Sequence, residues 1–151
     1  FKMMPPLRTR ADVAALRAAL ASGLIDAVAT DHAPHTAEEK DTSFEAAPPG
    51  VTGLEWAAAA VNTSVALDIA RFFDRMSVAP SRIAGLDERH GRLPEPGVPA
   101  NLVVFDPAAE WTPTTTRSRS NNSPYLGRSW RGRVRYTIFG GALTYSADAA
   151  A

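Results

Sequence analysis

The sequence predicts an α/β fold that continues into a β-rich carboxyl-terminal segment, and two patterns support this prediction. Residues 10–22 have helical periodicity and are followed directly by a short apolar run at residues 24–30, the order of helix, loop and buried strand found around parallel sheets. Beyond residue 93, apolar and polar residues alternate between turn sequences, which is typical of antiparallel hairpins. We therefore expect two structural parts, residues 1–92 and residues 93–146, followed by a disordered tail at residues 147–151.

The first helix has a recognisable start and end. Residues 9–12 resemble a capping box in which Asp12 replaces the usual glutamate, and Gly23 stops the helix. The strand expected at residues 24–30 should be buried on both faces, which places Asp31 at its carboxyl end, where α/β folds carry their chemistry. Five apolar side chains are expected in the core: Val13, Leu16, Leu20, Phe72 and Phe73.

A long connection and three helices should complete the first part. Residues 36–53 are polar and rich in proline and glycine, and a connection of this length inside a compact region is usually functional. Helices are expected over residues 54–66 and 67–76. A short third helix should follow Ser77, with Pro80 in its first turn.

The second part should be a small β structure. A proline-rich linker at residues 94–99 leads into a strand at residues 101–107, which a turn ends. Residues 133–145 predict a hairpin that turns at Gly140-Gly141. Residues 112–131 are rich in serine, threonine, arginine and asparagine and should form an exposed loop.

The composition limits the possible functions. Of the 151 residues, 45% are hydrophobic, which suits a packed core, and 16 basic residues balance 16 acidic ones, so neither nucleic acid nor an anionic membrane is an expected partner. No apolar stretch approaches the roughly 20 residues that span a bilayer. Without cysteine, any metal must be held by histidine, aspartate or glutamate, and a cytoplasmic location is expected.

The segment Ala29 to His35, "ATDHAPH", is the strongest candidate for a functional site. An aspartate at a strand end beside histidines can ligate a divalent metal and accept a proton from a metal-bound water. A catalytic zinc site needs about three protein ligands, however, and side chains on one turn diverge. From spacing alone, a polar turn and one edge of a metal site both remain possible.

Four segments together resemble the dihydroorotases, which are cyclic amidohydrolases. Residues 2–8 resemble the family's "K-x-N-P-P-L-R", and residues 29–40, "ATDHAPHTAEEK", are similar to its "D-H-A-P-H" segment. Residues 47–55 resemble the "A-P-x-G-x-x-G-L-E" that follows, and residues 99–106 look like the "A-D-L-V-V-F-D" of amidohydrolase carboxyl-terminal domains. The resemblance therefore extends over nearly the whole chain.

This resemblance implies a metal-dependent (β/α)8 barrel with a small β domain. Such an enzyme reversibly hydrolyses L-dihydroorotate to N-carbamoyl-L-aspartate in pyrimidine biosynthesis. By the match, Asp31 would bind metal and act as the general base, and His35 would hold the substrate carboxylate. Pro49 and Gly50 would offer backbone groups to the pyrimidine ring. The cofactor would be one or two divalent ions, with zinc expected and most of the ligands outside this chain.

The chain also departs from the family pattern. Met4 stands where the family has an asparagine that binds the substrate carboxylate, and a thioether cannot replace an amide. Nothing here matches the family's "H-x-H", carboxylated lysine and further histidines, which precede Phe1. We therefore expect an incomplete barrel: a carboxyl-terminal fragment, inactive alone, that contributes to a homo-oligomeric enzyme for a small-molecule substrate.

Two alternatives remain open at this stage. The first is a non-catalytic, dihydroorotase-like scaffold for aspartate transcarbamoylase, which the methionine at position 4 favours. The intact Asp31 and His35 count against a scaffold, because nothing structural demands both side chains. The second is another cyclic amidohydrolase, a hydantoinase or an allantoinase, whose corresponding segment usually differs after the aspartate.

Overall fold

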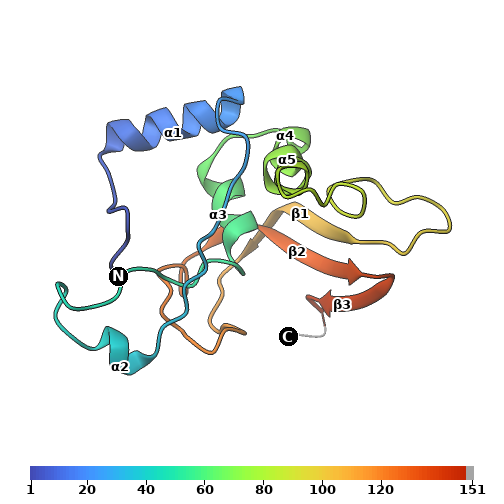
Figure 1. Ribbon diagram of the computed structural model, residues 1–151. Coiled ribbons are helices and arrows are strands. Elements are labelled where there is room, and N and C mark those ends of the chain that lie inside the picture. Colours follow the sequence, from blue (N-terminus) through green and yellow to red (C-terminus); the bar gives the residue numbers. More distant parts are fainter. Residues whose placement is uncertain (149–151) are drawn as a thin grey trace.

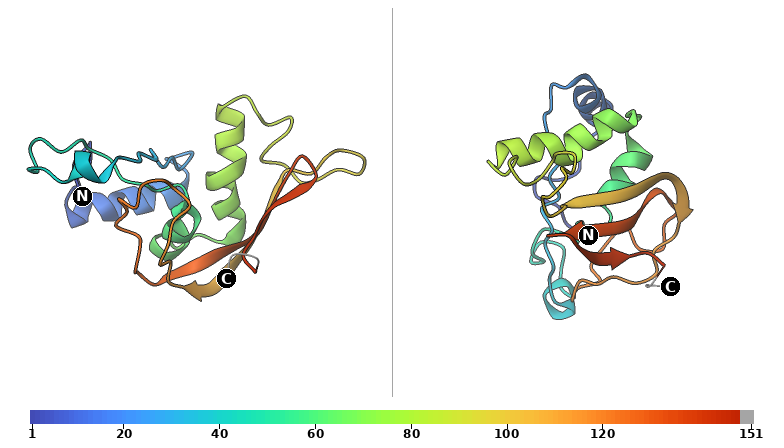
Figure 2. Two further views of the ribbon diagram at one scale, coloured as in Figure 1. Left: turned by 90° about the horizontal axis from the view of Figure 1, so that it is seen from below. Right: turned by 90° about the vertical axis from the view of Figure 1, so that its right-hand side faces the viewer.

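A computed structural model describes residues 1–148 of the chain. Helices precede all the strands of the sheet. In chain order the elements are α1 Arg10–Ser22, α2 Ala37–Lys40, α3 Ala57–Ser64, α4 Ile69–Phe73, the π-helical turn η1 Asp74–Val78, α5 Ala79–Ile83, β1 Leu102–Trp111, β2 Trp130–Phe139 and β3 Ala142–Ser146. Helices α3 to α5 lie beside the sheet, whereas α1 and α2 lie on the opposite side of the molecule from the β2–β3 hairpin (Figures 1 and 2). Within the part of the chain that the structure describes, no helix is long and apolar enough to cross a membrane.

Helix α1 begins and ends where the sequence predicts. The Thr9 hydroxyl accepts from the amide of Asp12, the Asp12 carboxylate accepts from the amide of Thr9, and Gly23 ends the helix with a φ of 92°. The core prediction for this helix is only partly right, because Leu20 is buried while Val13 and Leu16 are 39% and 56% exposed. An apolar stripe is buried only where another element packs on it, and the described residues leave much of these two side chains exposed.

The strand predicted at residues 24–30 is absent as a regular strand, which corrects that expectation. The segment runs without ladder pairing, and Leu24 is 81% exposed. One isolated parallel bridge joins His32 to Val51, just beyond the segment. A strand exists through hydrogen bonds to neighbours, and no described residue pairs along these positions, so an apolar run alone does not make one here.

Residues 54–83 are helical, as predicted, but the helix boundaries differ. The first helix, α3, is shorter than predicted, and the two helices expected after it are joined. Residues 69–83 form one uninterrupted helical run, in which α4, η1 and α5 succeed each other directly. Pro80 lies in the first turn of α5, as expected. Because proline has no amide hydrogen to donate, the preceding turn widens to a π-helical turn, in which the amide of Ala79 donates to the carbonyl of Asp74.

The three strands form an antiparallel sheet in the order β1-β2-β3. The predicted hairpin is present and turns at Gly140 and Gly141. Strand β1 is longer than predicted because it continues past Pro107, where the register shifts between Asp106 and Glu110. Such an irregularity lets a proline, which cannot donate to the ladder, remain within a strand. Phe72 of α4 stacks on Phe105 of β1 with ring centroids 4.9 Å apart, and this contact ties the helices to the sheet.

The predicted disordered tail differs at its first two residues. Ala147 is 2% exposed and its amide donates to the carbonyl of Arg135 over 2.8 Å. The carboxylate of Asp148 accepts from the side chains of Arg135 and Tyr136, at 3.0 Å and 2.9 Å. These bonds hold Ala147 and Asp148 against β2, beyond the end of β3. The remainder of the predicted tail, residues 149–151, lies outside the described residues.

Candidate functional site

The imidazole of His35 lies against the loop Pro48–Gly50. Its Nε2 is 3.1 Å from the carbonyl oxygen of Pro49, and because a carbonyl can only accept, this nitrogen carries a proton. The other ring nitrogen, Nδ1, lies 3.5 Å from Oε2 of Glu39, and the His35 side chain is 22% exposed. The structure therefore brings His35, Pro49 and Gly50 together, three of the four residues to which the resemblance assigns a role.

The helix that follows His35 is short but well capped. The Thr36 hydroxyl accepts from the amide of Glu39, and the Glu39 carboxylate accepts from the amide of Thr36 over 2.9 Å. The bond from the Thr36 amide lowers the pKa of Glu39 below its ordinary value, against a smaller effect of burial, and His35 lowers it further. An ionised carboxylate is thus fixed beside the His35 ring.

Gly50 permits the close approach of the loop to the histidine segment. Its φ is 111°, and a Cβ at this position would stand 2.6 Å from the Cβ of Ala33 and 3.6 Å from Nε2 of His35. Only glycine meets both conditions without strain. The amide of Ala33 donates to the carbonyl of Val51 over 3.0 Å, so the two segments run side by side.

Asp31 lies at the exposed start of this arrangement. Its φ of 43° falls in the left-handed region, which an L-residue adopts at a cost and which clusters at functional sites. Within the described part of the chain, no hydrogen bond or ion pair joins its carboxylate to another residue. The bonds that connect His35 with Pro49 therefore do not include Asp31.

His32 has a structural role that sequence reasoning missed. Its Nδ1 accepts from the amides of Gly53 and Leu54, at 3.2 Å and 3.1 Å. Nδ1 is therefore unprotonated, and the ring anchors the segment that follows the Pro48–Gly50 loop. Its donors lie about 20 residues away in sequence, so no local pattern could have indicated this role.

The loop at residues 112–131 is exposed at many positions, as predicted, but Ser123 within it is buried and packs on this site, which corrects part of the prediction. Thr52 is fully buried; its amide donates to the carbonyl of Asn122 over 2.9 Å, and its own carbonyl accepts from the hydroxyl of Ser123 over 3.2 Å. Ser123 is 5% exposed. Polar segments can be buried when their groups are bonded in this way.

The same loop also binds Glu55. Its carboxylate accepts from the Thr116 hydroxyl and from the amides of Arg117 and Ser118. Burial raises the pKa of Glu55, but these hydrogen bonds, aided by His32, outweigh burial and leave the pKa below its ordinary value of 4.5. The carboxyl-terminal half of the chain is thus joined to the loop beside His35.

The described residues do not form a metal centre by themselves. No group of three or more histidine, cysteine, aspartate or glutamate side chains comes together among residues 1–148. Asp31 has a free carboxylate of the right chemistry for a divalent ion, but the imidazoles of His32 and His35 are bonded to backbone groups. The chain offers one candidate ligand, not a complete set.

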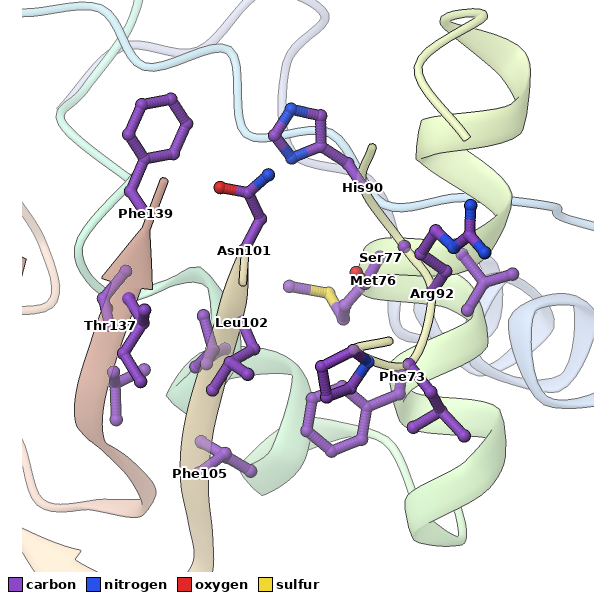
Figure 3. A pocket seen from close by; sticks show the side chains of 18 of the residues that line it. Phe73, Met76, Ser77, His90, Arg92, Asn101, Leu102, Phe105, Thr137 and Phe139 are labelled. Atoms are coloured by element: carbon purple, nitrogen blue, oxygen red, sulfur yellow. The ribbon is translucent and has the colours of Figure 1, made fainter. Parts of the chain in front are cut away.

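A separate cavity of about 640 Å³ lies between the α4–α5 helical run and the sheet. Phe73 and Met76 line it from the helices and Leu102 and Phe105 from β1 (Figure 3). None of the residues 31–55 lines it, and its wall is mainly apolar and aromatic. This cavity therefore does not belong to the His35 site.

Comparisons with known proteins agree with the observed fold. The sequence profile of the amidohydrolase family matches residues 5–144. A protein of Anaeromyxobacter dehalogenans named dihydroorotase is 45% identical over 155 residues, and the match covers 99% of this chain and 35% of that protein. A dihydroorotase of Streptomyces coelicolor is 47% identical over 150 residues, covering 95% of this chain and 35% of that protein. The chain therefore spans about a third of the length of the curated relatives it matches.

Solved structures also match the chain. The D-hydantoinase (dihydropyrimidinase) of a Thermus species superposes with a TM-score of 0.86 at 32% identity. The superposition covers 97% of this chain and 34% of that protein.

Proposed function

The chain belongs to the amidohydrolase family, and we propose that it supplies part of the active site of a dihydroorotase, which hydrolyses L-dihydroorotate to N-carbamoyl-L-aspartate. The observation that carries this proposal is the packing of His35 against Pro49 and Gly50, which unites two of the segments that resemble dihydroorotases. The 45% and 47% identity to relatives with that name supports the same activity.

Asp31 is the proposed general base. A divalent ion, for which we propose zinc, would supply a water whose pKa is lowered to near 7. The Asp31 carboxylate accepts a proton from the attacking water and returns it to the ring nitrogen that leaves as the amide bond breaks. Its exposure and its freedom from other hydrogen bonds among the described residues suit both a ligand and a proton carrier. The further ligands of the ion would come from outside those residues.

His35 and the Pro48–Gly50 loop are the proposed substrate-binding groups. The proton on Nε2 now directed to the Pro49 oxygen is available to a substrate carboxylate, if the ring exchanges one acceptor for the other. Pro49 and Gly50 lie next to that proton, so their backbone groups are placed to contact the ring of a substrate held by His35.

We further propose how the two parts of the chain serve a complete enzyme. Residues 1–92 would form the last units of a (β/α)8 barrel and residues 93–146 a segment of its small β domain. The single parallel bridge between His32 and Val51 fits a segment that belongs to a larger parallel sheet. A homo-oligomer, a complex with aspartate transcarbamoylase and a cytoplasmic location remain predictions from the resemblance.

A hydantoinase is the second candidate function. The fold of the D-hydantoinase from the Thermus species favours it, since that structure matches the chain with a TM-score of 0.86. Hydantoin and dihydrouracil share the cyclic amide of dihydroorotate but lack its ring carboxylate. The substrate carboxylate is therefore the group that separates the two candidates.

The proposal is tested by assaying the complete gene product that contains these residues, loaded with zinc, against L-dihydroorotate and against hydantoin. We expect ring opening of dihydroorotate, and loss of this activity in the near-isosteric Asp31→Asn variant with its metal content retained. Turnover of hydantoin without turnover of dihydroorotate would favour the second candidate. A folded, metal-loaded protein that turns over neither substrate would favour the scaffold alternative.

A further inference from the structure

Every backbone hydrogen-bonding group of the Pro48–Gly50 loop already has a partner in this structure. The carbonyl of Pro48 accepts from Nζ of Lys40 over 2.6 Å, and the carbonyl of Pro49 is bound by His35. The carbonyl of Gly50 accepts from Lys40 over 2.8 Å and from the side-chain amide of Asn122 over 3.1 Å. The amide of Gly50 donates to the carbonyl of Lys2 over 2.8 Å. The loop is therefore held from several sides.

Lys40 differs from the other partners because its ammonium group donates to the carbonyls of both residues that flank Pro49. An ammonium group has three donors, and two of them here hold the carbonyls on either side of the residue that His35 contacts. Hydrogen bonds from a charged donor are roughly twice as strong as neutral ones. Fixing the two flanking carbonyls determines which way the Pro49 carbonyl and the Gly50 amide face.

The loop carbonyls are the only groups that the ammonium of Lys40 binds within the described part of the chain. No carboxylate of residues 1–148 forms an ion pair with it, although Asp41 and Glu39 are its neighbours in sequence. Its side chain is partly buried. Placing a charged group in such a position is costly unless its bonds are made, so the loop carbonyls account for the position of Lys40.

Helix α2 connects this lysine to the histidine. Lys40 is the last residue of α2, and Glu39, immediately before it, lies 3.5 Å from Nδ1 of His35. The same short helix thus contacts the His35 ring through one side chain and the Pro48–Gly50 loop through the next. The relative placement of the two proposed substrate-binding groups depends on α2.

We propose that Lys40 is a positioning residue that presents the Pro48–Gly50 loop and His35 to the substrate. This inference rests on the proposed function for its kinetic consequence, but not for its structural one. Without the ammonium group, the loop loses two bonds and its carbonyls turn toward water, while Asp31 is untouched. Lys40→Met should therefore raise KM for dihydroorotate about tenfold, the equivalent of one strong hydrogen bond, and leave kcat within about twofold.

The test uses three variants of the complete, zinc-loaded gene product. Lys40→Met removes the charge, and Lys40→Arg keeps a cation that can donate to both carbonyls. Glu38→Met is the matched control, because Glu38 lies on the same short helix, is exposed, and has no side-chain hydrogen bond or ion pair to the loop among the described residues. We expect a raised KM only for Lys40→Met, and a KM within about threefold of the wild-type value for Lys40→Arg.

Hydrogen exchange at the Gly50 amide separates this inference from the proposed function. The Gly50 amide should exchange at least about tenfold faster in Lys40→Met than in the wild type or in Glu38→Met, whether or not the protein turns over dihydroorotate. If the wild type lacks that activity, the proposed function fails, and exchange alone decides the role of Lys40. Unchanged exchange, equal exchange in Lys40→Met and Glu38→Met, or an active enzyme whose KM is unmoved in Lys40→Met would overturn the inference.

Discussion

Replacing Gly50 by alanine tests the close approach on which the site is built. The φ of Gly50 is 111°, and an alanine held in this conformation would destabilise the folded state by about 1–3 kcal/mol. Its Cβ would also stand 2.6 Å from the Cβ of Ala33, whereas carbon atoms normally pack about 3.5–4.0 Å apart. The loop must therefore move by about 1 Å, at a further cost of about 1–3 kcal/mol.

Gly97→Ala is the matched control for this experiment. Gly97 has a φ of 83°, and a Cβ there would meet no atom within 4 Å, so this variant carries the backbone cost without the overlap. Urea unfolding should show that Gly50→Ala loses about 1–3 kcal/mol more stability than Gly97→Ala. KM for dihydroorotate should rise in Gly50→Ala alone, because the displaced loop carries Pro49 away from His35. Equal stability and equal KM in the two variants would refute the close approach.

Three further predictions concern separate parts of the molecule. Asp31→Ala should lower kcat by about 10²–10⁴-fold, whereas His35→Ala should chiefly raise KM, as steady-state kinetics of the complete gene product can show. Because hydrogen bonds hold the pKa of Glu55 below 4.5, the wild type should be more stable than Glu55→Gln above about pH 4.5. That advantage should disappear as the pH falls through the folded-state pKa of Glu55, which urea unfolding at several pH values would measure. Thr9→Ala should cost about 1 kcal/mol of stability by removing the cap of α1, and an unchanged unfolding midpoint would contradict the capping box seen there.

Features with local determinants were predicted correctly from the sequence. The start of α1 depends on Thr9 and Asp12, three residues apart, and the hairpin turn depends on two adjacent glycines. Features that need distant partners were not. The run at residues 24–30 has the composition of a strand, but pairing requires neighbours that its own residues cannot reveal.

The candidate site shows the same distinction. The resemblance to dihydroorotases pointed to His35, Pro49 and Gly50, and the structure brings these three residues together. The burial of Ser123 could not be predicted, because its partner Thr52 lies 71 residues away. The role of Lys40 was missed for a similar reason: the capping pattern of α2 indicates a helix, but not the loop that folds back onto its last residue.

The most direct test of the account is the preference of the complete gene product for a ring that carries a carboxylate. The ratio of kcat/KM for dihydroorotate to kcat/KM for dihydrouracil, which lacks that carboxylate, should be measured in the wild type and in His35→Ala. If His35, which lies against Pro49, binds the substrate carboxylate, the wild type should strongly prefer dihydroorotate. The His35→Ala variant should lose most of this preference. A wild type that prefers dihydrouracil, or a ratio that His35→Ala leaves unchanged, would contradict the account.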